Sequence, residues 1–209
     1  IVISTLPISI TSRLLGKKNN LKFRGVCSVY LFYNQEVILP KKIHWLYFDS
    51  EKTLFNRITE NKKLSKFVAP KNKSFLTAEI TYSMGDDFSK KNPKQIISRV
   101  VKDISKINLV DNKKLIDTSI NYEPFVYPVQ FMDYKSETYF IKSFIESFDN
   151  LYSVGAGGEF NYADSQILFH KSFDLVNSLT NRFNLFSNET KNLNRIDFNK
   201  SFKLGKTEV

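Results

Sequence analysis

The spacing of apolar residues predicts a series of strands in the first part of the chain. Apolar and polar residues alternate over residues 75–82, the period of a strand with one buried face. Over residues 21–33 both strand faces are largely apolar, with Val29, Leu31 and Tyr33 on one and Ser28, Tyr30 and Phe32 on the other. We therefore expect a central strand covered on both sides. The other predicted strands are residues 1–5, 42–48, 54–59, 115–129 and 151–154.

Two prolines mark the end of the strand predicted over residues 115–129. Pro124 and Pro128 have no N–H to give to a neighbouring strand. Prolines within sheets are confined to edges and bulges, so this segment should lie at a sheet edge, a bulge or the wall of a cavity.

Apolar residues recur at helical spacing in three later segments. Asn92 and Pro93 have the residue types of a helix N-cap and first position, and the apolar face that follows predicts a helix to about Lys106. Its solvent face is expected to hold Lys94, Ser98, Lys102 and Asp103. Further helices are predicted over residues 137–148 and 165–183, and a short one before Gly16. The pattern indicates an α+β fold whose mixed, mostly antiparallel sheet of five or six strands is covered by the helices over residues 93–106 and 137–148.

Composition places the chain among ordinary globular proteins. Its 209 residues, 42% hydrophobic and 25% charged, suffice for one sizeable core or two small ones. The single cysteine, Cys27, excludes a disulfide within the chain and favours a reducing compartment, so we expect a cytoplasmic location. No apolar run reaches the length of a membrane span, and no signal-peptide pattern precedes the first strand.

A net charge of +10 raises the question of a nucleic-acid partner. The lysines occur as scattered pairs among asparagines, for example at residues 17–18, 41–42, 62–63, 90–91 and 113–114. No recognition helix or aromatic ribonucleoprotein motif accompanies them, so nucleic-acid binding is not expected. His44 and His170 lack the spacing of a metal site, and no residue stands out as catalytic.

One junction near the C-terminal end has the character of a ligand site. The strand over residues 151–154 runs into Gly155-Ala156-Gly157-Gly158, and Asp164 and Ser165 then stand where a helix N-cap belongs. Glycines let a backbone approach a ligand closely, and a helix N-terminus favours an anion or an electron-rich oxygen. A phosphate or a cofactor carbonyl would suit this turn, although strand–glycine–helix junctions also occur for purely structural reasons.

The segment YSVGAGGEFNYADSQILFHKSFDLVNSL, residues 152–179, resembles the C-terminal flavin-contacting motif of the amine oxidase, protoporphyrinogen oxidase and UDP-galactopyranose mutase superfamily. Three more stretches resemble family segments in the same order. They are IVISTLP at residues 1–7, residues 42–60 with Ala69-Pro70, and YPVQFMDY at residues 127–134. The chain departs from the family where an arginine commonly follows the first glycine, here Ala156, and where Met and Asp commonly open the helix, here Ser165 and Gln166.

The resemblance implies FAD as cofactor and assigns residues to it. The N–H groups at Asp164, Ser165 and Gln166 would face the flavin N1 and C2 carbonyl, and Gly155, Gly157 and Gly158 would allow close approach to the ribityl and pyrophosphate region. The implied substrate-side residues are Trp45, Tyr47, Arg57, Tyr127 and Pro128. Arg57 would supply a cation for an acidic group of a small-molecule substrate, although a surface arginine is also a natural reading of this position.

The resemblance also implies that the nucleotide-binding unit is missing. The G-x-G-x-x-G motif of that unit does not occur here, and the chain opens directly within a predicted strand. We therefore expect the back part of a longer protein, inactive and poor at binding FAD by itself. Its parts would be residues 1–20 and 149–184, both belonging to an incomplete FAD-binding domain, the substrate-binding domain at 21–148, and a polar tail at 185–209.

Three functions remain open from the sequence. The first is the substrate-binding and flavin-closing part of an FAD-dependent oxidoreductase. The second is a UDP-galactopyranose mutase-like flavoenzyme acting on a nucleotide sugar, which the pattern GAGGEFNYAD favours because that family has a similar Glu followed by an aromatic residue. The third is a non-catalytic, basic α+β binding domain.

Overall fold

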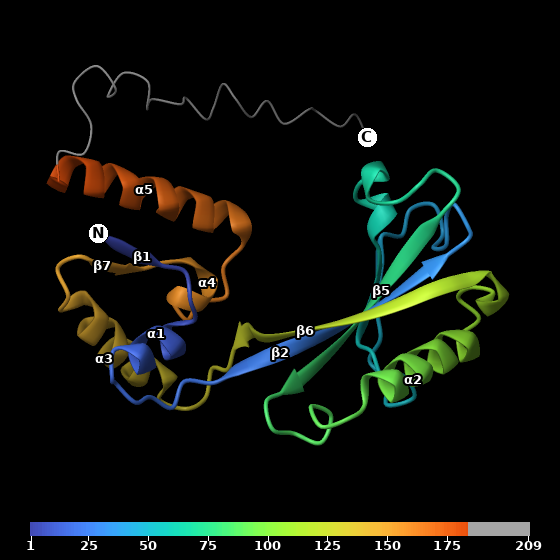
Figure 1. Ribbon diagram of the computed structural model, residues 1–209, viewed down its shortest axis with the longest axis horizontal. Helices are drawn as coiled ribbons and strands as arrows, with labels where there is room; N and C mark the ends of the chain where they lie inside the picture. The colour runs from blue at the N-terminus through green and yellow to red at the C-terminus, as the bar shows by residue number, and fades with distance from the viewer. Residues whose placement is uncertain (184–209) are drawn as a thin grey trace, which may run out of the picture. The chain divides into compact units, whose positions relative to one another are not determined.

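The computed structural model describes residues 1–183 of the chain (Figure 1). The chain forms two compact units. The first unit is Ile1–Tyr162 and the second is Ala163–Val209. Within its described part, the second unit contains the long helix α5 (Ser165–Phe183), with the bounds expected from the sequence. The polar tail predicted over residues 185–209 lies outside the described residues.

A five-stranded antiparallel sheet dominates the first unit. Its strand order is β3-β4-β5-β2-β6, and every neighbouring pair is antiparallel. The strands are β2 (Phe23–Tyr33), β3 (Trp45–Tyr47), β4 (Arg57–Glu60), β5 (Ser74–Ser83) and β6 (Leu115–Pro128). Short 3-10 turns η1 (Asn61–Lys63), η2 (Lys66–Val68) and η3 (Asn112–Lys114) lie in its connections. The mixed α+β class predicted from the sequence is confirmed.

Helix α2 (Pro93–Lys106) covers one face of this sheet. Asn92 caps it as expected, accepting a hydrogen bond from the Lys94 N–H at 2.9 Å. Its side chains Ile96, Val100 and Ile104 are buried in one cluster with the inward residues of the central strands, which include Val29, Leu31, Leu76, Ala78 and Ile58. This cluster is the main core.

Within the first unit, no helix covers the opposite face of the sheet in the same way. Ser28, Tyr30 and Phe32, on the second face of β2, are only half-buried, and Asp117, Ser119 and Asn121 of β6 are exposed. The expectation that β2 would be covered on both sides is therefore wrong. Aromatic residues on this face contact one another, with the Phe32 and Phe75 rings 5.5 Å apart, which explains its apolar appearance in the sequence.

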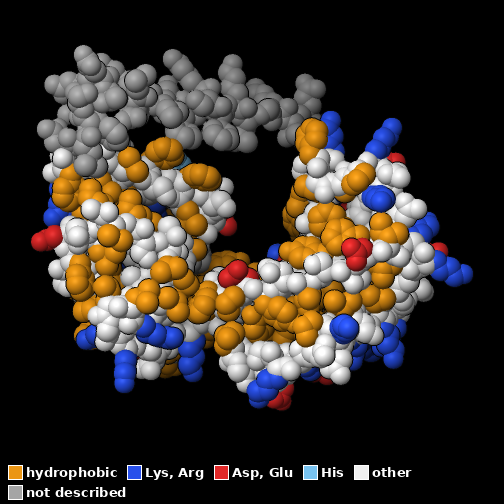
Figure 2. Space-filling view, viewed as in Figure 1, with side chains coloured by type: hydrophobic (Ala, Val, Ile, Leu, Met, Phe, Trp, Pro, Cys, Tyr) orange, Lys and Arg blue, Asp and Glu red, His pale blue; other side chains and the backbone are white. Residues whose placement is uncertain are grey.

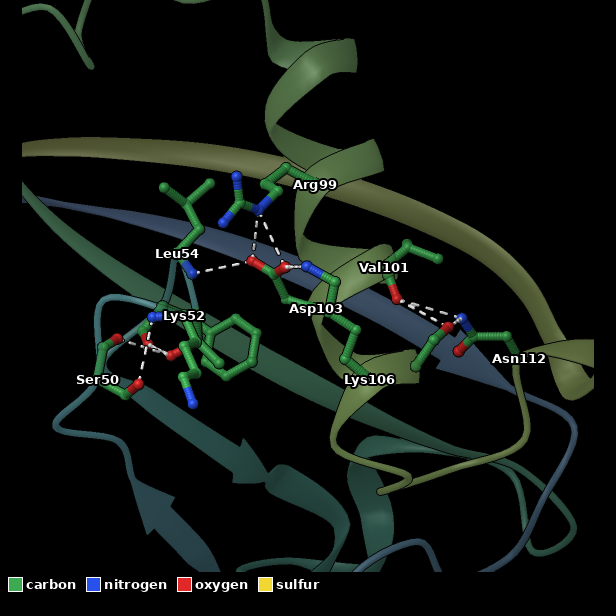
Figure 3. Close-up of polar contacts among 11 residues, drawn as sticks. Ser50, Lys52, Leu54, Arg99, Val101, Asp103, Lys106 and Asn112 are labelled. Atoms are coloured by element: carbon green, nitrogen blue, oxygen red, sulfur yellow. Dashed lines mark hydrogen bonds and ion pairs between the residues drawn. The ribbon is translucent and has the colours of Figure 1, made fainter.

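Asp103 corrects a second expectation, because it is fully buried and does not face solvent. Figure 3 shows its carboxylate at the centre of a network that joins α2 to the segment before β4. It accepts hydrogen bonds from the Leu54 N–H at 3.0 Å and from Arg99 Nε at 2.8 Å, and Lys106 Nζ lies 3.3 Å away. The helical spacing of polar residues predicts a solvent-facing Asp103, but it carries no information about these partners.

A second, smaller core joins the two ends of the first unit. Strands β1 (Val2–Ser4) and β7 (Leu151–Ser153) pair in parallel, with Val2 opposite Leu151. Helices α1 (Ile8–Leu14) and α3 (Tyr134–Glu146) pack beside them around Ile8, Phe23, Ile141 and Phe160. Helix α3, expected to cover the large sheet, packs against α1 and β7 instead. The large sheet is thus an insertion between two neighbouring parallel strands.

The edge position predicted for the proline-containing strand is confirmed, because β6 is an outer strand of the sheet. Its register against β2 shifts between Arg24 and Val26, so the segment with Pro124 bulges opposite Gly25. A side chain at Gly25 would lie 2.6 Å from the Tyr82 ring and 2.8 Å from the Glu123 carbonyl oxygen. Glycine therefore permits the close approach of strands that the bulge requires.

Candidate functional site

One row of residues crosses the uncovered face of the five-stranded sheet from edge to edge. Strand pairing places Tyr47 opposite Arg57, Arg57 opposite Glu79, Glu79 opposite Ser28, and Ser28 opposite Asn121. Directly opposed residues of antiparallel strands project from the same face, so all five share it. The row brings a cation, a carboxylate, a phenol, a hydroxyl and an amide to one surface.

Arg57 makes the strongest contacts in this row. Its Nη2 lies 2.5 Å from Glu79 Oε2, and its Nη1 donates to the Tyr47 hydroxyl at 3.3 Å. Partial burial acts to lower the pKa of the guanidinium, but the hydrogen bonds to Glu79 and Tyr47 and the charge of Glu79 outweigh it and raise that pKa. Arg57 is therefore a fixed cation, oriented by two neighbours on adjacent strands.

Tyr127, near the end of β6, completes this surface. Burial raises the pKa of its hydroxyl; the charge of Arg57 opposes that shift, while Glu79, Tyr162 and Tyr47 add to it. Its ring lies 5.7 Å from the ring of Tyr162. We call Tyr47, Arg57, Glu79, Tyr127 and Tyr162 the open-face cluster. The bulge opposite Gly25 precedes Tyr127 in β6 and sets the register that places it here.

The open-face cluster contains three of the five residues predicted for the substrate side. Trp45 shares the face of Tyr47, because the two are two residues apart on β3, and it is half exposed. Pro128 follows Tyr127 directly in β6 and so belongs to the other face.

Sequence reasoning missed Glu79 and Tyr162. Glu79 was visible as the only charged residue within the alternating pattern of residues 75–82. It lies on the polar side of that pattern, which is the side that pairs with Arg57. Tyr162 belongs to the glycine-rich motif itself, but only the fold shows that its ring lies beside that of Tyr127.

The glycine motif forms a short turn, α4 (Gly155–Gly158), directly after β7. Gly155 has a φ of +89°, which favours glycine, and a side chain there would meet nothing within 4 Å. A side chain at Gly157 would lie 3.5 Å from Pro7, and one at Gly158 would lie 3.1 Å from Ser153 Oγ. Packing within the chain thus favours glycine at position 158, a side chain at position 157 would make an ordinary contact, and the space beside Gly155 is open.

Phe160 anchors this turn to the rest of the first unit. It is buried, its ring lies 5.1 Å from that of Phe23 on β2, and its φ is +52°. A large residue in the left-handed region is strained, and the burial of its ring offsets that strain. Two residues later, Tyr162 reaches the open-face cluster. The glycine turn and the open face are therefore connected through one short segment.

Asp164, Ser165 and Gln166 lie in the second unit. The Asp164 carbonyl accepts hydrogen bonds from the N–H groups of Ile167 at 3.0 Å and Leu168 at 3.2 Å, so it stands at the N-cap of α5 as the sequence predicted. Because the two units are described separately, the position of this helix start beside Gly155 stays a prediction.

Other kinds of site are not found among residues 1–183. No group of three or more His, Cys, Asp or Glu in this range is arranged to hold a metal ion. Within the same residues, no helix has both the length and the apolar character needed to cross a bilayer. A shallow hollow between α3 and the segment after α4 is lined by Tyr134, Thr138, Lys142 and Phe160, among others, and by none of the predicted site residues.

The fold and site define a class: an α+β domain with an open antiparallel sheet, inserted between the paired parallel strands of a second, smaller part.

No protein-family model and no curated protein matches the chain. Among solved structures, reduced UDP-galactopyranose mutase is similar, with 18% sequence identity and a TM-score of 0.67 over 90% of this chain and 42% of that one. A protein assigned as a protoporphyrinogen oxidase, from Exiguobacterium sp. 255-15, has 14% identity and a TM-score of 0.58 over 75% and 36%.

These similarities concern the fold alone, because the identities are low. Both proteins carry names from the superfamily that the sequence resembles, so the predicted resemblance is confirmed at the level of structure. The chain spans less than half the length of either structure's chain.

Proposed function

We propose that this chain is the C-terminal part of an FAD-dependent oxidoreductase of the amine oxidase and protoporphyrinogen oxidase type. It would carry the substrate domain and the segment that closes over the flavin. The observation that carries the proposal is the insertion of the open sheet between the parallel strands β1 and β7, in a fold shared with two proteins of the superfamily. That topology places the glycine turn at the border of the sheet domain.

The paired strands β1 and β7 support an incomplete cofactor domain. Parallel sheets are normally buried on both faces, yet this one has two strands of three residues each. Ile1, Val2 and Ile3 are each about half exposed. We propose that further strands of the nucleotide-binding segment, supplied by the longer protein, pair with and cover these residues.

The glycine turn fits FAD in part. Open space beside Gly155 would admit a phosphate or the edge of a flavin, whereas Gly157 and Gly158 would support the turn from behind by packing on Pro7 and Ser153. Asp164, Ser165 and Gln166 would offer the N–H groups of the α5 start to the flavin N1 and C2 carbonyl. Bound FAD would supply two-electron transfer to and from an organic substrate.

The open-face cluster would bind the substrate. Arg57 and Glu79 form a neutral pair, so together they suit a ligand group that can donate and accept hydrogen bonds. An acidic group would have to share the Arg57 guanidinium with Glu79. The Tyr127 hydroxyl would donate a hydrogen bond, and the aromatic rings of Tyr47 and Trp45 would pack against the ligand.

A second candidate, a mutase-like flavoenzyme acting on a nucleotide sugar, has one observation in its favour. The similarity to UDP-galactopyranose mutase covers 90% of this chain, against 75% for the protein assigned as a protoporphyrinogen oxidase, and has the higher TM-score. Hydroxyl groups of a sugar would also suit the neutral pair of Arg57 and Glu79. A cytoplasmic location stays our proposal, supported by the free and buried thiol of Cys27.

The longer protein that contains this chain, purified with FAD, would test these proposals. Anaerobic mixing with candidate amines or other organic substrates should bleach the visible absorption of the flavin. Conversion of a UDP-sugar to an isomer, only after prior reduction of the flavin and without net oxidation, would replace the lead proposal by the mutase-like one. If the longer protein neither binds flavin nor changes either substrate, both proposals fail.

A further inference from the structure

A small protruding segment at one end of the sheet combines exposed apolar residues with lysines. The connection from β4 to β5 holds η1 and η2, and there Leu64 is 61% exposed, Phe67 87% and Val68 49%. Lys66 and Lys71 lie exposed beside them in sequence. Figure 2 shows hydrophobic and Lys or Arg side chains side by side at the upper right of the view, where this connection lies. We call these five residues the tip patch.

The backbone beneath the tip patch is held by two buried or half-buried ammonium groups. Lys62 Nζ donates to the carbonyl oxygens of Pro70 at 2.8 Å, Lys71 at 2.5 Å and Lys73 at 2.7 Å. Lys63 Nζ donates to the Leu39 carbonyl at 2.6 Å and also to that of Pro40. These contacts close the β4–β5 connection on itself and tie it to the connection between β2 and β3. The exposed apolar side chains therefore stand on a preorganised support.

The connection that carries this patch has charged side chains of one sign. Residues 61–73 contain the lysines at 62, 63, 66, 71 and 73 and no Asp or Glu. The loop fastened by Lys63 adds Lys41 and Lys42, both exposed, and one exposed carboxylate, Glu36. The carboxylate that precedes the segment, Glu60, is fully buried and accepts hydrogen bonds from the N–H groups of Ile38 and Leu39. In the sequence these lysines look like scattered pairs, whereas the fold gathers them at one end of the sheet.

We propose that the tip patch docks the protein onto an anionic phospholipid bilayer surface. Lysines near such a surface are attracted by its negative potential, each by about 1 kcal/mol. Phe67, Leu64 and Val68 would enter the boundary between headgroups and acyl chains, as apolar residues of peripheral proteins do. Lys66 lies 5.2 Å from the centre of the Phe67 ring, so a cation accompanies the most exposed apolar side chain.

Charge and shape together favour a bilayer over the other acidic partners. Nucleic acid would satisfy the lysines but would leave three aliphatic and aromatic side chains without a role. A protein surface would have to be apolar at its centre and acidic around it. A bilayer offers an apolar layer directly beneath anionic headgroups, in the same order in which the tip patch presents its groups.

The experiment is co-sedimentation of the chain with vesicles of phosphatidylcholine alone and with vesicles that contain phosphatidylserine. Binding should require phosphatidylserine and weaken steeply as salt rises. K66E/K71E should weaken binding at least roughly thirtyfold, which is the loss of about 1 kcal/mol at each of two lysines. F67S should weaken it about tenfold or more.

Matched controls separate docking at the tip patch from general attraction. K94E/K102E changes the net charge equally at two exposed positions of α2, and M132S removes an apolar side chain that is 88% exposed elsewhere. Both should bind within about threefold of the parent chain, a difference under 1 kcal/mol. Equal losses in the control and tip-patch variants would overturn the proposal. Each variant is checked for an unchanged circular dichroism spectrum.

Two further results would also overturn the proposal. One is tight binding of nucleic acid or an acidic protein that depends on Lys66 and Lys71, with no vesicle binding. The other is vesicle binding by the chain that is lost in the longer protein, which would show that the rest of that protein covers the tip patch. The proposal does not depend on flavin, so it and the proposed enzymatic function can fail separately.

Discussion

Arg57 shows how much the role of one side chain depends on its neighbours across the sheet. In the sequence it is an arginine among apolar residues, compatible with a surface position or with an anion site. In the fold it is held by Glu79 and Tyr47 from the two adjacent strands. Cross-strand partners are set by register, and register cannot be calculated from one strand's own sequence. The residue was therefore predictable and its partner Glu79 was not.

Replacement of Arg57 by alanine tests the open-face cluster. Glu79, whose side chain is 16% exposed, would keep its charge and lose its partner, so stability should fall by about 1 kcal/mol after allowance for solvent screening. Ligand affinity of the longer protein should fall roughly tenfold or more. Trp45 lies on the same face, so a change in tryptophan fluorescence that disappears in a W45F variant of the longer protein reports the binding.

The variant R57K provides the control for this experiment. It keeps the positive charge but cannot donate from two nitrogens to two strands. We expect the ligand affinity of R57K to lie between that of the parent protein and that of R57A. Unchanged affinity in R57A would show that the open-face cluster does not contact the ligand.

Tyr33 offers a prediction about alkaline stability. Its hydroxyl is buried and has no hydrogen-bond partner among the described residues, and burial raises its pKa to about 12. Below about pH 10 its contribution to stability is fully present. Between about pH 10 and 12 the unfolded chain releases the proton while the folded chain retains it, so about 3 kcal/mol is lost.

Replacement of Tyr33 by phenylalanine should therefore stabilise the chain by about 1 kcal/mol at neutral pH, because the variant buries no unpaired hydroxyl. The variant should also lack the loss of folding stability that Tyr33 causes between about pH 10 and 12. A loss of similar size, between about pH 9 and 11, should persist, since burial raises the pKa of Cys27 to about 11, although its hydrogen bond with Tyr122 lowers it. Urea denaturation from neutral pH to about pH 12 measures the stability at neutral pH and its loss at alkaline pH. A Y33F variant that is less stable than the parent at neutral pH would contradict the account.

At the scale of elements, the boundaries of strands and helices were largely predictable. Periodicity located α2 and α5, and Asn92 with Pro93 gave the start of α2. The partners of these elements were not predictable. Helix α3 has an apolar face that would suit the large sheet, yet it packs with α1 and β7. An amphipathic face shows that a helix is partly buried, but it does not identify the surface against which it packs.

Asp103 tests how α2 is fixed to the sheet domain. D103A would leave the Leu54 N–H without its acceptor, and Arg99 and Lys106 would lose their shared partner. We expect a loss of about 2 to 3 kcal/mol of stability. The exposed neighbour Lys102 supplies the control K102A, expected within about 0.5 kcal/mol of the parent. Equal stability of D103A and K102A would show that the buried network does not hold the helix.

Gly25 tests the bulge that sets the position of Tyr127. In G25A the new methyl group would meet the Tyr82 ring and the Glu123 carbonyl oxygen at distances that require the backbone to move. A loss of about 2 kcal/mol is expected. Because the bulge sets the register of Tyr127, ligand affinity of the longer protein should fall as well. The control variant S119A, at an exposed position of β6, should leave both stability and ligand affinity unchanged. If G25A behaved like S119A, the bulge would not be required.

At the scale of the whole molecule, the large sheet is inserted between the paired parallel strands β1 and β7 within the first unit. Strands β1 and β7, from the two end segments, pair in parallel; that these segments belong to one cofactor domain stays a prediction. The sequence could not show that the face of the sheet opposite α2 is open, because aromatic residues such as Tyr30 and Phe75 read as buried. The two halves of the expected flavin contact, at Gly155 and at Asp164, lie in different units.

The central claim is that these pieces complete a flavin site in a longer protein. Its most direct measurement is the amount of flavin released on denaturation from that protein, purified under native conditions, compared with the amount from this chain purified alone. We predict close to one FAD per longer polypeptide and little or none per short chain. A longer protein that contains no flavin and takes up none on incubation with FAD would contradict the account.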